Sequence, residues 1–159
     1  MAEGSLLTDK IMAFVGRTEE PNITKVEDGS IQRFAEAVGT SNPLCNDVAY
    51  AKNSKHGRLV APPSFKGWPV KSSEKMELGA VGELMKAGAP TNLLDAGVIY
   101  EYFDVIKSGD TLVSFGKIDK IAEKTQKSGA RMLVVTSMTT YTNQDGKVVL
   151  KEYHDLIMR

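Results

Sequence analysis

The stretch that decides the fold of this 159-residue chain is Phe34-Ala35-Glu36-Ala37-Val38-Gly39-Thr40-Ser41-Asn42-Pro43-Leu44-Cys45, followed after a polar segment by Leu59-Val60-Ala61-Pro62-Pro63-Ser64-Phe65. Apolar residues from Ile31 to Val38 recur at the i, i+3, i+4 and i+7 spacing, which predicts a helix with one buried face. Gly39 then stands where a left-handed residue ends a helix. Asn42 precedes a proline and is therefore expected to leave the helical conformation. The stretch predicts a helix that breaks into a polar turn.

Further helical segments are expected on both sides of this stretch. Residues 9–15 predict a short helix, and either Asn46 or Asp47 is expected to cap another short one. Residues 72–87 form the longest helical pattern in the chain. Gly82 lies inside that pattern, and because glycine disfavours a helix interior, its presence indicates that another backbone packs closely there.

From Gly97 onward the sequence is rich in β-branched and aromatic residues, which favour strands. Four strands are expected, over residues 98–106, 111–122, 130–142 and 147–158, with a bulge near Gly116 in the second. Helices followed by a run of antiparallel strands predict an α+β fold, in which helices cover one face of the sheet. The edges of such a sheet would be free to pair with a second copy or a partner.

The composition is that of an ordinary globular protein, with 42% apolar and 25% charged residues. Its 20 basic and 20 acidic residues cancel, so we expect no nucleic acid and no membrane surface as partner. The single cysteine excludes an internal disulfide and suits a reducing compartment. The polar N-terminal residues predict no signal peptide, and no apolar run approaches the ~18 residues of a membrane span. We therefore expect one cytoplasmic domain over residues 1–159.

Two blocks of sequence carry a family resemblance. The segment Phe34-Ala35-x-Ala37-Val38-Gly39-Thr40-Ser41-Asn42-Pro43-Leu44-Cys45-x-Asp47, with Ala61-Pro62-Pro63-Ser64-Phe65, resembles the MaoC-like hydratases and dehydratases. Within them it is most similar to the fatty-acid-synthase-type N-terminal dehydratase domains. The turn Ser108-Gly109-Asp110-Thr111-Leu112 and the hairpin Asp145-Gly146-Lys147-Val148-Val149 are similar to that family too. The resemblance implies a hot-dog fold, in which a long antiparallel sheet wraps around a central helix, and a dimer.

The resemblance also implies a chemistry. Working members hydrate trans-2-enoyl thioesters or dehydrate 3-hydroxyacyl thioesters, carried on coenzyme A or acyl carrier protein, and need no other cofactor. Their motif reads Gly-Asp-x-Asn-Pro-hydrophobic-His; its Asp and His activate a water, while a backbone N–H polarises the thioester carbonyl. Gly39 and Asn42-Pro43-Leu44 match this motif. Thr40 occupies the Asp position and Cys45 the His position, and neither side chain is a base near neutral pH.

These departures imply a subunit that lacks the catalytic pair and binds the acyl thioester beside a catalytic MaoC-like subunit, in a homodimer or a heterodimer. Substrate contacts are expected from Asn42, Pro62, Pro63 and Ser64. Ser64 is further expected to start a helix whose N–H groups face the thioester. The simpler interpretation is that Pro62-Pro63-Ser64 is a rigid connector and that Asn42 only shapes the turn.

Other interpretations stay open at this point. Cys45 is also explained as a small buried hydrophobe. No metal site is expected, because no cluster of His, Cys and acidic residues has ligand spacing. The chain could instead be a self-sufficient atypical hydratase, or a hot-dog thioesterase that uses Glu74, Glu77 or Glu83 as its base. A non-enzymatic acyl-CoA-binding protein is a third interpretation.

Overall fold

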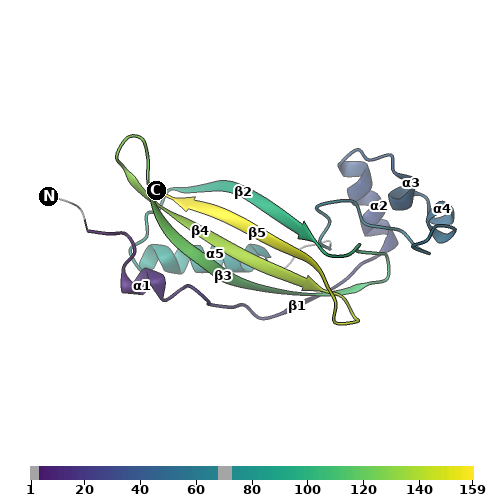
Figure 1. Cartoon of the computed structure of the whole chain (residues 1–159), viewed down its shortest axis with the longest axis horizontal. Coiled ribbons are helices and arrows are strands. Elements are labelled where there is room, and N and C mark those ends of the chain that lie inside the picture. The colour runs from purple at the N-terminus through teal and green to yellow at the C-terminus, as the bar shows by residue number, and fades with distance from the viewer. Residues whose placement is uncertain (1–3, 68–72) are drawn as a thin grey trace.

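A long antiparallel sheet forms the body of the molecule (Figure 1). The computed structural model describes residues 4–67 and 73–159, and of residues 73–79 it describes the backbone alone. Within these residues the sheet has five strands in the order β1-β3-β4-β5-β2, and every neighbouring pair is antiparallel. The strands are β1 (Asn22–Lys25), β2 (Leu93–Tyr102), β3 (Thr111–Thr125), β4 (Arg131–Thr142) and β5 (Val148–Met158).

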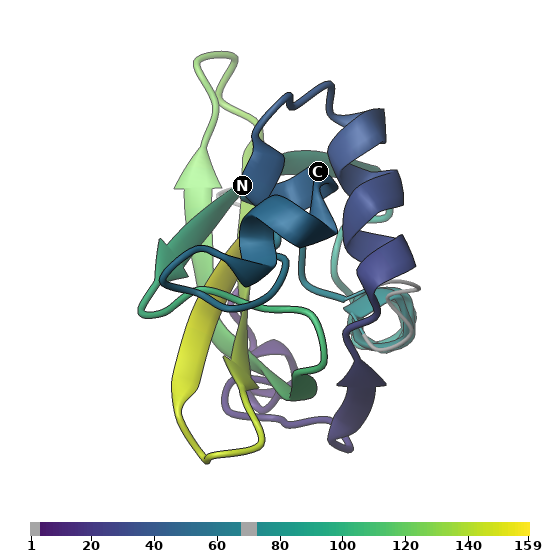
Figure 2. The ribbon, with the colours of Figure 1, turned by 90° about the vertical axis from the view of Figure 1, so that its right-hand side faces the viewer.

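The helices occupy two places relative to this sheet. The elements α2 (Asp28–Ala37), α3 (Pro43–Asn46) and α4 (Val48–Lys52) gather at one end, whereas α5 (Ser73–Lys86) lies against one face (Figures 1 and 2). A short α1 (Asp9–Met12) lies near the opposite end of the sheet. Figure 2 shows the sheet curving so that β2 and β1 lie on opposite sides of the molecule. Among the described helices, none is long and apolar enough to cross a membrane.

Two apolar clusters hold these layers together. One joins the helical end to the sheet and includes Ile31, Ala35, Leu59, Phe65, Leu112 and Leu150. The second lies under the described part of α5 and includes Val81, Leu84, Ile118, Leu133 and Met158. In the second cluster, every second residue of β4 and β5 faces α5, at Leu133 and Val135 and at Leu156 and Met158, because alternate side chains of a strand share one face of a sheet. The α+β architecture predicted from the sequence is therefore confirmed.

The strand boundaries depart from the prediction at β2 and β3. β2 starts at Leu93 rather than at residue 98, and it ends at Tyr102 rather than at residue 106. The irregularity predicted near Gly116 lies instead between Ile118 and Lys120, where the β3–β4 register shifts. A second shift occurs in β2 at Gly97, whose φ of 138° favours glycine.

Three predictions about the helical segments are wrong in detail. Residues 43–46 form one helical turn, α3, where only a polar turn was predicted. Val38, predicted on the buried face of α2, is 54% exposed because the helix ends at Ala37. Gly82 has open space where a Cβ would stand, so no close backbone contact explains it.

Candidate functional site

The turn after α2 is built by asparagine side chains. Gly39, with φ of 71°, reverses the chain at the end of the helix as predicted. The side-chain oxygen of Asn42 then accepts a hydrogen bond from the Leu44 N–H at 3.0 Å and caps α3, whose first residue is Pro43. The Asn46 side chain donates back to the carbonyl of Thr40 at 2.8 Å. These bonds fix the segment that runs from Thr40 to Cys45.

This segment forms one wall of a cavity of about 490 Å³, a size within the usual range for small-molecule sites. A second wall comes from residues 60–65 and a third from the end of β2 and the chain beyond it. Most of the lining is apolar. The lining residues are Thr40, Asn42, Cys45, Val60, Ala61, Pro62, Pro63, Phe65, Tyr102, Phe103, Asp104, Val105 and Ile106.

The structure brings five of the six candidate site residues to this cavity: Thr40, Asn42, Cys45, Pro62 and Pro63 line it. Ser64, the sixth, lies between two lining residues but does not start a helix, because the next described helix begins at Ser73. Ser64 instead adopts a left-handed φ of 71°, unusual for a residue other than glycine. Its N–H donates to the hydroxyl of Tyr102 at 2.7 Å. The predicted helix start at Ser64 is thus wrong.

Tyr102 itself was missed as a site residue. The sequence placed it on a strand, with nothing to indicate that its hydroxyl would meet a loop 38 residues earlier in the chain. The only signal was the pattern of β2, which puts Tyr100 and Tyr102 on the same face of the sheet; their rings lie 6.3 Å apart. That face is also the one that carries the buried Leu150, the register partner of Tyr102 on β5.

The titratable groups of the lining are poor bases. Burial raises the pKa of the Cys45 thiol, which is 3% exposed, so the thiol stays protonated near neutral pH. The hydrogen bond from Lys147, at 2.6 Å, and a second from the Val105 N–H lower the pKa of Asp104, which leaves this carboxylate weakly basic. Thr40 does not titrate in this range. Among the described residues that line the cavity, none is therefore suited to general base catalysis.

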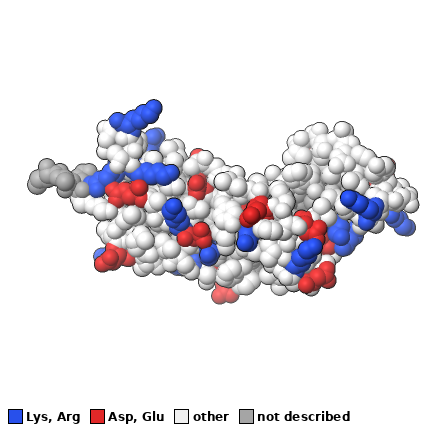
Figure 3. Space-filling view, in the orientation of Figure 1, with Lys and Arg blue, Asp and Glu red and all other residues white. Residues whose placement is uncertain are grey.

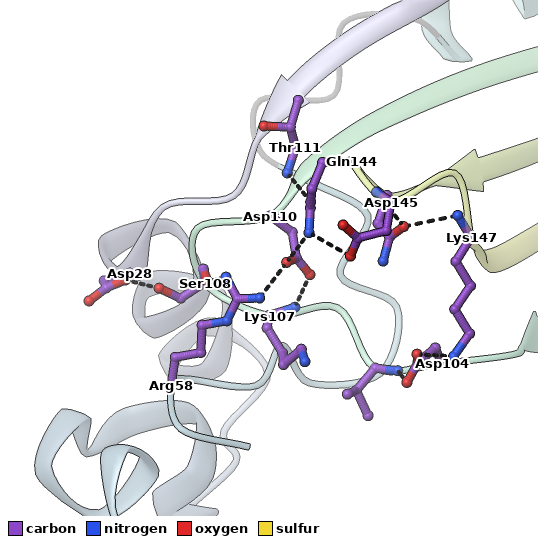
Figure 4. A network of polar contacts seen from close by, with 12 residues as sticks. Asp28, Arg58, Asp104, Lys107, Ser108, Asp110, Thr111, Gln144, Asp145 and Lys147 are labelled. Carbon is purple, nitrogen blue, oxygen red and sulfur yellow. Dashed lines mark hydrogen bonds and ion pairs between the residues drawn. The ribbon is translucent and has the colours of Figure 1, made fainter. Parts of the chain in front are cut away.

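A polar network fixes the turn that follows the third wall (Figure 4). Asp110, 1% exposed, accepts from the Lys107 N–H at 2.8 Å and pairs with Arg58 at 3.0 Å. Gln144 of the β4–β5 hairpin also reaches Asp110 and accepts a hydrogen bond from the Thr111 N–H. The Ser108 hydroxyl donates to Asp28 at the start of α2, which ties the helical end, the turn and the hairpin into one unit.

A second polar cluster lies beneath the sheet. The buried carboxylate of Glu152 on β5 pairs with Lys66 at 2.5 Å and accepts from the Tyr141 hydroxyl at 3.0 Å. The ammonium of Lys66 also lies 5.9 Å from the centre of the Tyr100 ring, within the range of a cation–π contact. Because Lys66 follows Phe65 directly, this cluster anchors the second wall of the cavity to the sheet.

The remaining candidates lie away from the cavity. Glu83 pairs with Arg17 and lies outside the lining, which removes Glu83 as the base of a thioesterase. The side chains of Glu74 and Glu77 lie outside the described residues. In the part of the chain that the structure describes, no group of three or more His, Cys, Asp or Glu side chains could hold a metal ion.

Comparison with known proteins places the chain in a family. Residues 13–152 match the family described as the FAS1-like dehydratase domain region. The chain belongs to this family. The resemblance of the sequence to MaoC-like and fatty-acid-synthase-type dehydratases is thereby confirmed, as is the hot-dog fold, since solved MaoC-like dehydratases share this architecture.

Individual relatives and one solved structure give further points of reference. A UPF0336 protein of Parafrankia sp. is 29% identical over 157 residues, with 92% of each chain covered. A probable enoyl-CoA hydratase alpha subunit of Thermomonospora curvata is 25% identical over 88% of this chain; the chain spans about half, 48%, of that relative. The solved HadBC (3R-hydroxyacyl-ACP dehydratase) complex of Mycobacterium tuberculosis superposes with a TM-score of 0.66 at 19% identity, covering 91% of this chain and 96% of that one.

Proposed function

We propose that this chain is the acyl-binding subunit of a MaoC-like hydratase/dehydratase, and that a partner subunit supplies the catalytic Asp and His. One observation carries the proposal. The cavity lies at the position of the family motif, but Thr40 and Cys45 occupy the two catalytic positions. A family fold with its pocket retained and its acid–base pair absent fits a subunit that binds substrate for another.

The lining of the cavity supports an acyl thioester as ligand. Its apolar walls suit an acyl chain, because burial of each CH₂ group is worth about 0.8 kcal/mol. Phe65 stacks edge-on against Phe34 at 5.5 Å, which keeps the ring in the wall fixed. Asn42, Pro62 and Pro63 are proposed to contact the substrate, whose carrier is coenzyme A or acyl carrier protein; no further cofactor is required. A cytoplasmic location stays a prediction.

The long edge of the sheet is the proposed contact with the partner. β2 pairs with β5 on one side, and among the described residues no strand covers its other side. Its exposed side chains are apolar or aromatic at Leu93, Leu94, Val98, Ile99 and Tyr102. Figure 3 shows the margin of the molecule over β2 as a hollowed and mostly uncharged surface. Asp95 and Glu101 are the exposed charged residues of β2. A free edge of this length with mostly apolar exposed side chains favours pairing with another strand. The names of two relatives, an alpha subunit and a HadBC complex, describe multi-subunit proteins.

Reconstitution tests the proposal. The purified chain is assayed for hydration of crotonyl-CoA alone, and then after co-expression with a hot-dog protein that carries an intact Asp and His. We expect negligible hydration by the chain alone and full hydration by the co-purified complex. The control is the same complex with the partner's catalytic Asp replaced by Asn, which should be inactive.

Two results would contradict the proposal in different ways. Robust hydration by the isolated chain would show that it is self-sufficient. Tight binding of acyl-CoA with no turnover in any partner mixture would identify it as an acyl-CoA-binding protein instead.

A further inference from the structure

We infer that the Tyr102 hydroxyl is the group that donates a hydrogen bond to the thioester carbonyl of the ligand. The inference rests on the proposed function, because it assigns a role within the same cavity. It names a specific donor where the sequence led us to expect the backbone N–H groups of a helix beginning at Ser64.

The backbone of the second wall has no donor to spare. Pro62 and Pro63 lack an N–H altogether. The four other N–H groups of residues 60–65 are all engaged within the protein: Val60 donates to Leu44, Ala61 to Ile106, Ser64 to Tyr102 and Phe65 to Pro62. A carbonyl in the cavity must therefore find its donor elsewhere.

Most backbone N–H groups of the first and third walls are also hydrogen-bonded within the protein. Leu44 donates to the Asn42 side chain and Cys45 to the Asn42 carbonyl. Phe103 and Asp104 both donate to Val149, and the Val105 N–H donates to the Asp104 side chain. Two backbone N–H groups of the lining are not engaged by these bonds, that of Ile106 and that of Tyr102, which faces the free edge of β2. The other donors that remain in the described lining are the side chains of Thr40, Asn42, Cys45 and Tyr102.

The Tyr102 hydroxyl is the strongest of these donors. A phenol is more acidic than the alcohol of Thr40 or an amide N–H, whether of Asn42 or of the backbone, and a thiol such as that of Cys45 is a weak donor. The Tyr102 oxygen also accepts the Ser64 N–H at 2.7 Å. Accepting one hydrogen bond polarises a hydroxyl and strengthens the bond that it donates. The Ser64 N–H thus acts on the ligand through the phenol.

The pair is held in place before any ligand arrives. Ser64 keeps its left-handed backbone, and two residues later the Lys66–Glu152 ion pair anchors the same segment to β5. Tyr102 is itself fixed as the last residue of β2, paired in register with Leu150. A donor whose position is fixed in advance stabilises developing negative charge on a carbonyl oxygen without reorganisation.

Paired ligands test this role directly. Hexanoyl-CoA and its thioether analogue, S-hexyl-CoA, differ only in the carbonyl, and calorimetry on the full chain measures their binding. The wild type should bind the thioester more tightly than the thioether. Tyr102→Phe should reduce that preference by roughly threefold to tenfold, the value of one net hydrogen bond. Tyr100→Phe is the matched control. It removes a tyrosine hydroxyl from a residue that does not line the cavity, and it should leave the preference for the thioester over the thioether unchanged.

A spectroscopic measurement covers the case in which the freed Ser64 N–H replaces the phenol in Tyr102→Phe. A fluorinated tyrosine at position 102 keeps the contact with Ser64 but is a stronger donor, because its phenol is more acidic. The infrared band of an isotope-labelled thioester carbonyl should then move to lower frequency than in the wild type. An unmoved band would overturn the inference.

The outcomes separate the inference from the proposed function. If neither ligand binds to the wild type, the proposed function fails and the inference fails with it. If both ligands bind but Tyr102→Phe weakens both equally, and fluorination leaves the carbonyl band unmoved, the acyl-binding function stands and the role of Tyr102 is refuted.

Discussion

Replacing Asp110 by alanine tests whether the polar network behind the cavity holds the helical end of the molecule to the sheet. Asp110 is buried, and its carboxylate accepts from the Lys107 N–H and pairs with Arg58. Loss of the carboxylate leaves the Lys107 N–H unsatisfied, which costs about 1–3 kcal/mol. The Arg58 pair adds less, about 0.5–1 kcal/mol, because the Arg58 side chain is 40% exposed and water screens it.

We therefore expect Asp110→Ala to lower the free energy of unfolding by about 1.5–4 kcal/mol. Urea denaturation followed by circular dichroism measures this loss, and the midpoint of thermal unfolding should fall by roughly 5–15 °C for a chain of this size. Asp110→Asn keeps an acceptor for the Lys107 N–H and should lose only about 1–2 kcal/mol. Acyl-CoA binding should weaken in parallel, since the turn continues directly from the Val105–Ile106 wall of the cavity.

Asp119→Ala is the matched control for this experiment. Asp119 pairs with Lys117 at 2.9 Å, but both side chains are about one-third exposed, at 36% and 35%. Its loss should cost less than about 1 kcal/mol. If Asp110→Ala is no more destabilising than Asp119→Ala, the network does not hold the two parts together and the reasoning is refuted.

Three other predictions follow from single residues. Ser64→Gly should stabilise the chain by about 1 kcal/mol in urea, because glycine tolerates the left-handed backbone; a loss of stability would contradict the strain. Ile99→Lys on β2 should abolish partner binding in size-exclusion chromatography. Ile23→Lys on β1 is the control, because Ile23 is 69% exposed and Ile99 68%, and it should leave partner binding intact; equal effects would refute the assignment of the edge. Cys45, the single cysteine, should react with iodoacetamide at least about tenfold more slowly in the folded chain than in urea at pH 7.5, because burial raises the pKa of its thiol; equal rates would place it at an open surface.

Much of the fold could be predicted because neighbouring residues decide it. The helical spacing that placed Ile31 and Ala35 on one face of α2 requires only local periodicity, and both are buried. Gly39 ends that helix with the expected left-handed backbone. The strands β4 and β5 begin within one residue of their predicted starts, because hydrophilic turns of characteristic composition bound them.

The one-turn helix α3 shows where a correct local rule gave a wrong conclusion. Asn42 does leave the helical region, with ψ of 116°, as a residue before proline should. The same extended residue is also an ideal helix cap, and proline is favoured at the first position of a new helix. The sequence signal for a break and the signal for a start were therefore identical.

The candidate site could be predicted only in part, because its decisive contacts are long-range. The hydrogen bond from Ser64 to Tyr102 spans 38 residues, and the ion pair from Lys66 to Glu152 spans 86. Neither leaves a pattern in the sequence, since strand register and loop path are set by packing of the whole chain. The residues of the resemblance located the cavity, but its hydrogen-bonding groups required the structure.

The two margins of the sheet are unequal, and this limits the stoichiometry of any assembly that grows by strand addition. β1 offers four residues immediately after Pro21, whereas β2 offers ten. When a second chain pairs along β2, the long edge strand of both chains is covered. The next chain would meet only the four residues of β1, so strand addition of this kind would stop at two subunits.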